Sequence, residues 1–134
     1  MSIATAPTFG DVVRRQRMVR PPYQDRAVPR LVLDQLLADA QKAPSAGFSQ
    51  GFAYLVLEGE QTEVFWRHTR PQDPPGTWSA PVVVLPLENK QAYLDRYSEP
   101  DKAATNMGGN ESAWPVPYWT VDTSFSAMIL MLSA

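Results

Sequence analysis

The clearest element of the sequence is a helix whose apolar positions share one face. These positions fall at i, i+3, i+4 and i+7, the period of an amphipathic helix: Leu33, Leu36, Leu37 and Ala40. Pro29 suits the first turn of this helix, because its fixed φ favours the helical start. Pro44 ends it, and the small residues that follow predict a loop.

The rest of the chain alternates short predicted strands and helices. Apolar runs predict strands at 53–57 and 81–85, and the second run is apolar throughout, which suits a strand covered on both faces. Further helices are predicted at 9–17, 61–68 and 90–97, and the proline- and glycine-rich segments 71–78 and 98–117 are predicted loops. The pattern indicates one domain over residues 1–134, of the α/β or α+β class.

The last predicted helix begins near Trp119 or Thr120 and is apolar on most sides. One face carries Val121, Phe125, Met128 and Leu132, and Ile129, Leu130 and Met131 fill the others. A helix of this kind is expected to be buried all round. No Gly cap, closing basic residue or proline follows it, so the sequence predicts a domain that is incomplete at its C-terminus.

Composition narrows the possible chemistry. The net charge is -2, with 12 basic and 14 acidic side chains, which argues against a dedicated nucleic-acid binder. The chain has no Cys and a single His, His68, which excludes thiolate chemistry and a His-rich metal site. The neighbours of His68 give no context for a Ser-His-Asp triad, so a surface histidine near a helix end is expected. A redox reaction would therefore need a bound organic cofactor. No run is long enough for a signal peptide or a membrane span, so we expect no membrane partner and a cytoplasmic protein.

Two segments carry candidate binding chemistry. Four arginines lie at the end of the first helix and in the turn after it, within residues 14–20. The planar guanidinium suits phosphate, but arginines near a helix C-terminus also favour the helix dipole and solvate the surface. The second segment, residues 43–50, is a loop of small residues whose backbone could approach a flat ligand, although such loops are often plain turns.

Taken together and in this order, the two segments resemble the nitroreductase family of flavoenzymes. The relevant stretches are Arg17-Met18-Val19-Arg20, Ala27-Val28-Pro29, the helix that follows, and Ala43-Pro44-Ser45-Ala46-Gly47-Phe48-Ser49-Gln50. The resemblance implies an α+β fold with a central sheet flanked by helices, in an intertwined homodimer that binds FMN.

The resemblance also implies which residues bind the flavin. Gln16, Arg17, Met18 and Arg20 would lie along one part of the cofactor, with Arg17 and Arg20 on its phosphate or ribityl chain and on the N1/O2 edge of its ring. Pro44, Ser45, Ala46 and Phe48 match the loop that reaches the flavin of the other subunit. Gln16 replaces an expected Arg, Met18 an expected Ser and Phe48 an expected Asn.

The resemblance implies an NAD(P)H-dependent oxidoreductase that passes hydride through FMN to a nitroaromatic, quinone or similar acceptor. No protein acid or base is assigned, and no metal is expected. A non-catalytic relative that binds flavin for storage or sensing is the alternative, and a basic nucleic-acid module at residues 14–20 is a third. Because the family's later flavin contacts are missing, the 134 residues alone are expected to bind FMN weakly or not at all.

Overall fold

The computed structural model describes residues 6–134. The predicted helices and strands are confirmed, with small shifts at their ends. The α-helices and strands are α1 (Phe9–Arg15), α2 (Arg30–Ala40), β1 (Phe52–Glu58), α3 (Glu60–Thr69), β2 (Val82–Glu88), α4 (Lys90–Arg96) and α5 (Tyr118–Ser133). The 3-10 turns are η1 (Ala46–Phe48), η2 (Pro100–Thr105) and η3 (Glu111–Ala113).

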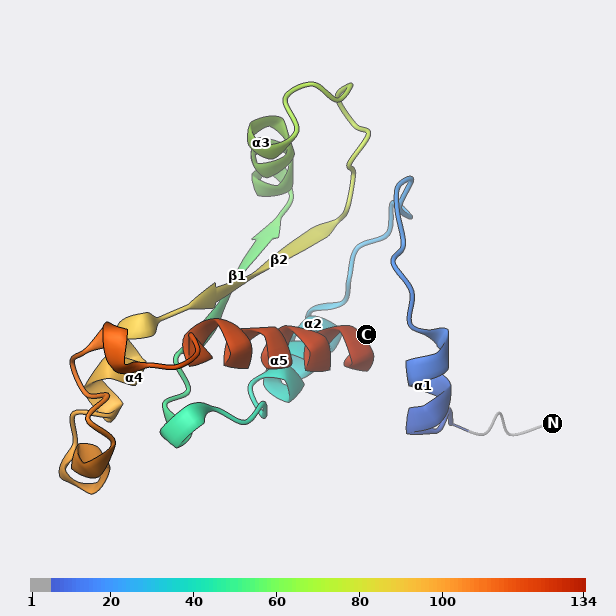
Figure 1. Ribbon diagram of the computed structural model, residues 1–134. Coiled ribbons are helices and arrows are strands. Elements are labelled where there is room, and N and C mark those ends of the chain that lie inside the picture. The colour runs from blue at the N-terminus through green and yellow to red at the C-terminus, as the bar shows by residue number, and fades with distance from the viewer. Residues whose placement is uncertain (1–5) are drawn as a thin grey trace.

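The two strands form an antiparallel ribbon that rises from the helices, with α3 at its far end (Figure 1). Phe52 pairs with Glu88 and Glu58 with Val82. The prediction that the second strand is covered on both faces is wrong: of its residues only Val83 is buried. The reason is that, within the described residues, this sheet has two strands, and α5 is the helix that packs against both of them.

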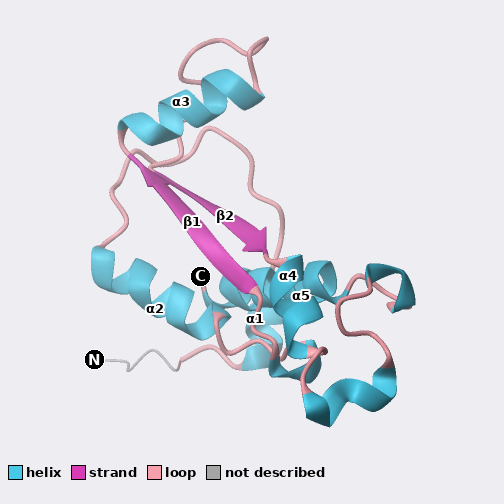
Figure 2. Cartoon of the chain, turned by 90° about the vertical axis from the view of Figure 1, so that its left-hand side faces the viewer, coloured by secondary structure: helices cyan, strands magenta, loops and turns pink. Residues whose placement is uncertain are grey.

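Helix α5 is the axis of the helical part, with α2 packed beside it (Figure 2). The prediction that this helix is buried on all sides is wrong, because one side alone is covered. Its buried positions are Trp119, Asp122, Thr123 and Ser126, whereas Phe125, Met128 and Met131 are about half exposed, at 51%, 47% and 48%. The covered face is thus more polar than the exposed one.

An aromatic core fixes the segment that follows α4. Tyr93, Leu94, Trp114 and Trp119 are buried together, and Trp114 Nε1 donates to the carbonyl of Met107 over 2.9 Å. The tryptophan ring stacks edge-on against Tyr97, with centroids 4.6 Å apart. This packing gives the predicted loop 98–117 a fixed course, with η2 and η3 within it.

Candidate functional site

Hydrogen bonds fix the loop between α2 and β1 at several of its residues. The backbone N–H of Ala46 donates to Oδ2 of Asp122 over 2.7 Å. The N–H of Gln50 donates to the hydroxyl oxygen of Ser45 over 2.9 Å, and Ser49 Oγ donates to the Ala46 carbonyl over 2.7 Å. The Ala46 N–H is therefore not available to a ligand. The Ser45 hydroxyl oxygen accepts the Gln50 N–H, so this hydroxyl can still donate its own proton to a ligand.

Asp122 is the buried centre of this arrangement. The residue is 3% exposed, and its carboxylate also accepts the hydroxyl proton of Tyr93 over 2.9 Å. Burial, together with the hydrogen bond to Asp122, raises the pKa of Tyr93 well above its ordinary value, so the phenol stays protonated. One turn further along α5, Ser126 Oγ donates to the carbonyl of Ala40, at the end of α2, and also bonds Tyr54.

Helix α4 holds the next peptide of the loop. Arg96 Nε donates to the carbonyl of Gly47 over 2.9 Å, while both Nη atoms bond Asp101 over 2.8 Å. That hydrogen-bonded guanidinium lowers the pKa of the Asp101 carboxyl. Gly47 has φ +62, and a Cβ there would lie 2.6 Å from Tyr97. The loop therefore requires glycine at this position for two independent reasons.

Phe48 ends the turn with its side chain in solvent. Its φ is +57, in the left-handed region, and the residue is 76% exposed. Gln50 also has a positive φ, of +49. An aromatic residue in this conformation is uncommon, because its Cβ crowds the neighbouring backbone.

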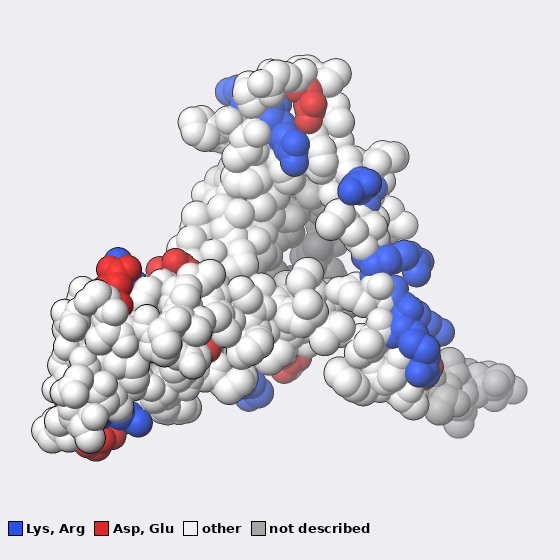
Figure 3. Space-filling view, viewed as in Figure 1, with Lys and Arg blue, Asp and Glu red and all other residues white. Residues whose placement is uncertain are grey.

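The arginine segment begins where α1 ends. Thr8 and Asp11 form a capping box at the helix start, and Arg14 pairs with Asp11 over 2.8 Å. Arg17 and Arg20 are exposed, and neither pairs with a carboxylate among residues 6–134. Blue side chains gather on this side of the molecule in Figure 3. The two guanidinium groups are therefore available to an anion.

The predicted flavin residues fall into two groups at opposite ends of α5. Gln16 Nε2 lies 3.4 Å from the carbonyl of Met131, near the end of the helix, whereas Ala46 bonds Asp122, near its start. At 1.5 Å per residue, Asp122 and Met131 are roughly 13 Å apart along the axis. The structure groups Gln16, Arg17, Met18 and Arg20 in one place and Pro44, Ser45, Ala46 and Phe48 in another.

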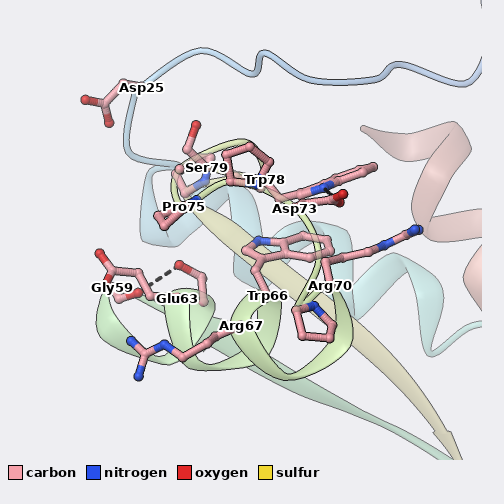
Figure 4. Close-up of a pocket in the computed structure, with 16 residues that line it drawn as sticks. Asp25, Gly59, Glu63, Trp66, Arg67, Arg70, Asp73, Pro75, Trp78 and Ser79 are labelled. Atoms are coloured by element: carbon pink, nitrogen blue, oxygen red, sulfur yellow. Dashed lines mark hydrogen bonds between the residues drawn. The ribbon is translucent and has the colours of Figure 1, made fainter.

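A cavity of about 590 Å³ lies elsewhere, between α3 and the 70–81 loop (Figure 4). Trp66 and Trp78 stack there with centroids 5.3 Å apart, and Arg70 lies 4.9 Å from the Trp78 ring. Trp78 Nε1 donates to Asp73 over 2.6 Å. None of the eight predicted flavin residues lines this cavity.

Other kinds of site find little support in residues 6–134. No group of three or more His, Asp or Glu side chains is arranged to hold a metal ion there. His68 is exposed in the last turn of α3, as the sequence predicted. No helix in the described part of the chain is long and apolar enough to span a membrane.

Part of the chain matches a known protein family. Residues 13–74 match the family model described as the nitroreductase family. No curated protein gives a significant sequence match. The matched stretch contains both the arginine segment and the loop held by Asp122.

Solved structures share the fold. A Staphylococcus epidermidis protein assigned as an NAD(P)H:FMN oxidoreductase aligns with TM-score 0.66 at 17% identity, over 98% of this chain and 70% of that one. A protein from Exiguobacterium sibiricum, assigned as a nitroreductase and solved in complex with FMN, gives 0.66 at 19% identity, over 98% and 71%. A nitroreductase-like protein from Streptococcus mutans gives 0.67 at 18%, over 93% and 69%. The α+β fold is therefore nitroreductase-like, and the chain spans about 70% of the length of these relatives.

Proposed function

We propose that this chain, nitroreductase-like in sequence and in fold, is a flavin-dependent oxidoreductase that uses FMN. NAD(P)H would be the hydride donor, and a nitroaromatic, quinone or similar small molecule the acceptor. FMN, when bound, supplies the chemistry of taking up a hydride and passing it on. The observation that best supports this proposal is that the segment matched to the family, residues 13–74, contains both predicted flavin motifs.

The residues present fit the anionic end of such a cofactor. Arg17 and Arg20 offer guanidinium donors that no described carboxylate occupies, and these groups suit a phosphate or the electron-rich edge of a reduced ring. Gln16 and Met18 would contribute contacts beside them. On the 44–48 loop, Pro44 and Ala46 offer apolar surface, Ser45 its hydroxyl proton and Phe48 its ring.

We propose a homodimer in which the loop of one copy meets the arginine segment of the other. Two observations support it. The two groups of flavin residues lie at opposite ends of α5 within one chain. The half-exposed apolar face formed by Phe125, Met128 and Met131 also needs a cover, because exposed apolar surface costs about 25 cal/mol per Å². A second copy of this face supplies one.

A non-catalytic flavin-binding relative is the second candidate. It is favoured by Phe48, which stands where the family pattern has Asn and so removes an amide from the loop. Such a protein would bind flavin without turning over NAD(P)H. The cytoplasm is the compartment we propose for either candidate.

The test is a titration of FMN into the purified protein, followed by quenching of flavin fluorescence. NAD(P)H oxidation is then measured by absorbance, with a naphthoquinone present. Saturable quenching together with quinone-dependent oxidation supports the oxidoreductase. Quenching without oxidation favours the non-catalytic relative, and the absence of quenching at any accessible FMN concentration rules out both.

A further inference from the structure

Phe48 combines two unfavourable features, a strained backbone and an exposed ring, and no contact of its own side chain offsets them. The residue combines a left-handed φ of +57 with 76% exposure, so it has both backbone strain and apolar surface in water. Burial of the ring would normally offset such strain, and here the ring is not buried. Strained residues that persist are held by the surrounding structure and cluster at functional positions.

Hydrogen bonds from two helices fix the backbone just before Phe48. Asp122 of α5 accepts the Ala46 N–H over 2.7 Å, and Arg96 of α4 donates to the Gly47 carbonyl over 2.9 Å. The ring of Tyr97 lies against Gly47, where a Cβ would come within 2.6 Å. Both anchoring side chains are themselves bonded, Asp122 to Tyr93 and Arg96 to Asp101. The loop therefore cannot relax without breaking buried or charged contacts.

We propose that Phe48 is a specificity-determining residue that stacks on the planar ring of the electron acceptor, and that Asp122 and Arg96 are positioning residues for it. The phenyl ring has no hydrogen-bonding group, so flat aromatic surface is the partner it prefers. The acceptor class is therefore a flat aromatic molecule, such as a naphthoquinone, rather than a compact inorganic ion. This inference rests on the proposed oxidoreductase function.

A comparison of two electron acceptors, both reduced by NAD(P)H, separates stacking on Phe48 from the rest of the reaction. NAD(P)H transfers a hydride equivalent to 1,4-naphthoquinone, which takes one proton from solvent and becomes the hydroquinone. With ferricyanide, two ions each take one electron and the proton of the hydride is released to water. Stacking on Phe48 can assist the first acceptor and not the second, because ferricyanide has no flat ring.

The experiment compares the parent protein with Phe48→Ala and Phe48→Tyr, using FMN-loaded protein. Phe48→Ala is expected to raise KM for naphthoquinone about three- to tenfold, the factor that corresponds to one aromatic contact. KM for naphthoquinone should rise relative to KM for ferricyanide, with FMN kept saturating in every assay, and Phe48→Tyr, which keeps the ring, should behave like the parent. Equal changes for both acceptors, or no change for either, would overturn the proposal.

The positioning role is tested with Asp122→Ala and with Arg96→Ala, which removes the hydrogen bond to the Gly47 carbonyl. Each is expected to raise KM for naphthoquinone selectively, as Phe48→Ala does, because the ring loses its fixed place. Thr62→Ala is the matched control: it removes a 2.8 Å hydrogen bond from a buried hydroxyl in α3, outside the loop. If Thr62→Ala raises KM for naphthoquinone as much as Arg96→Ala does, general destabilisation explains the effect and the positioning role is wrong.

Failure of the proposed function gives a different pattern. In that case the parent protein oxidises NAD(P)H with neither acceptor. Failure of the inference alone leaves the parent active with both acceptors, while Phe48→Ala shows no difference between them.

Discussion

The hydroxyl of Tyr93 donates to Oδ2 of Asp122 over 2.9 Å, and this bond joins α4 to α5 in the interior. The same oxygen accepts the backbone N–H of Ala46 over 2.7 Å. One buried carboxylate thus connects two helices and the loop that carries half of the predicted flavin residues. Because a buried charge without partners is strongly destabilising, the position of this loop is coupled to the stability of the core.

We predict that Tyr93→Phe lowers the free energy of unfolding by about 1–3 kcal/mol, the range for losing a hydrogen bond to a buried charged group. The substitution keeps the ring and removes the donor. Tyr97→Phe is the matched control, because no described hydrogen bond uses the Tyr97 hydroxyl. Urea denaturation followed by tryptophan fluorescence measures both. Equal losses in the two variants would show that the bond to Asp122 contributes nothing specific.

The raised pKa of Tyr93 predicts a loss of stability in alkali. The folded protein holds the phenolic proton more tightly than the unfolded chain, whose tyrosines titrate near pH 10. The stabilising contribution is therefore complete below about pH 10 and declines as the pH rises further. The difference in unfolding free energy between the parent and Tyr93→Phe should be smaller at pH 11 than at pH 8. A difference that grows with pH would reverse the sign and refute the assignment.

The elements could be predicted from the sequence because each carries a local signal. The spacing of Leu33 and Ala40 has the helical period, and the run 53–57 is short, apolar and followed by Gly59. The capping box at Thr8 and Asp11 is likewise a local pattern. Which face of a helix is covered is not local, since it depends on what packs there. For that reason the sequence predicts that Phe125 is buried, whereas the structure shows it about half exposed.

The anchors of the 45–50 loop could not be predicted for the same reason. Asp122 meets Ala46 across 76 positions and Arg96 meets Gly47 across 49, and no motif of fixed spacing links them. One signal was present in the sequence: Asp122 is the sole charged residue between Trp119 and the last residue. A lone carboxylate in an apolar helix needs a buried partner, and such a residue should be treated as a candidate anchor.

Glycine at position 47 gives a second test of the loop. Gly47→Ala is expected to destabilise the protein by about 1–3 kcal/mol, because a Cβ both disfavours the positive φ and meets the Tyr97 ring at 2.6 Å. Gly76→Ala is the control, since φ there is +81 and no atom lies within 4 Å of a new Cβ. Thermal unfolding should show the larger drop for Gly47→Ala. Equal drops would mean that the contact with Tyr97 does not constrain the loop.

Flavin affinity should depend on Arg20 and much less on Arg14. Arg20→Ala is predicted to weaken FMN binding by about 1.5–3 kcal/mol, the range for a hydrogen bond to a charged group. Arg14 already pairs with Asp11 on the surface of α1, over 2.8 Å, so Arg14→Ala should change affinity little. Fluorescence titration of FMN measures both variants. An unchanged dissociation constant for Arg20→Ala would remove this residue from the proposed site.

The exposed face of α5 tests the dimer. Phe125, Met128 and Met131 form a stripe of half-exposed apolar side chains, and an obligate interface built on it would bury more than about 2,000 Å² in total. We expect the parent to be a dimer by light scattering and Phe125→Glu to be a monomer, because a charge in the centre of a dry interface is unpaired. Val64→Glu, at a 59% exposed position on α3, should leave the dimer intact. A monodisperse parent monomer with native circular dichroism would contradict the proposal, since the apolar stripe would then be stable in water without a second copy.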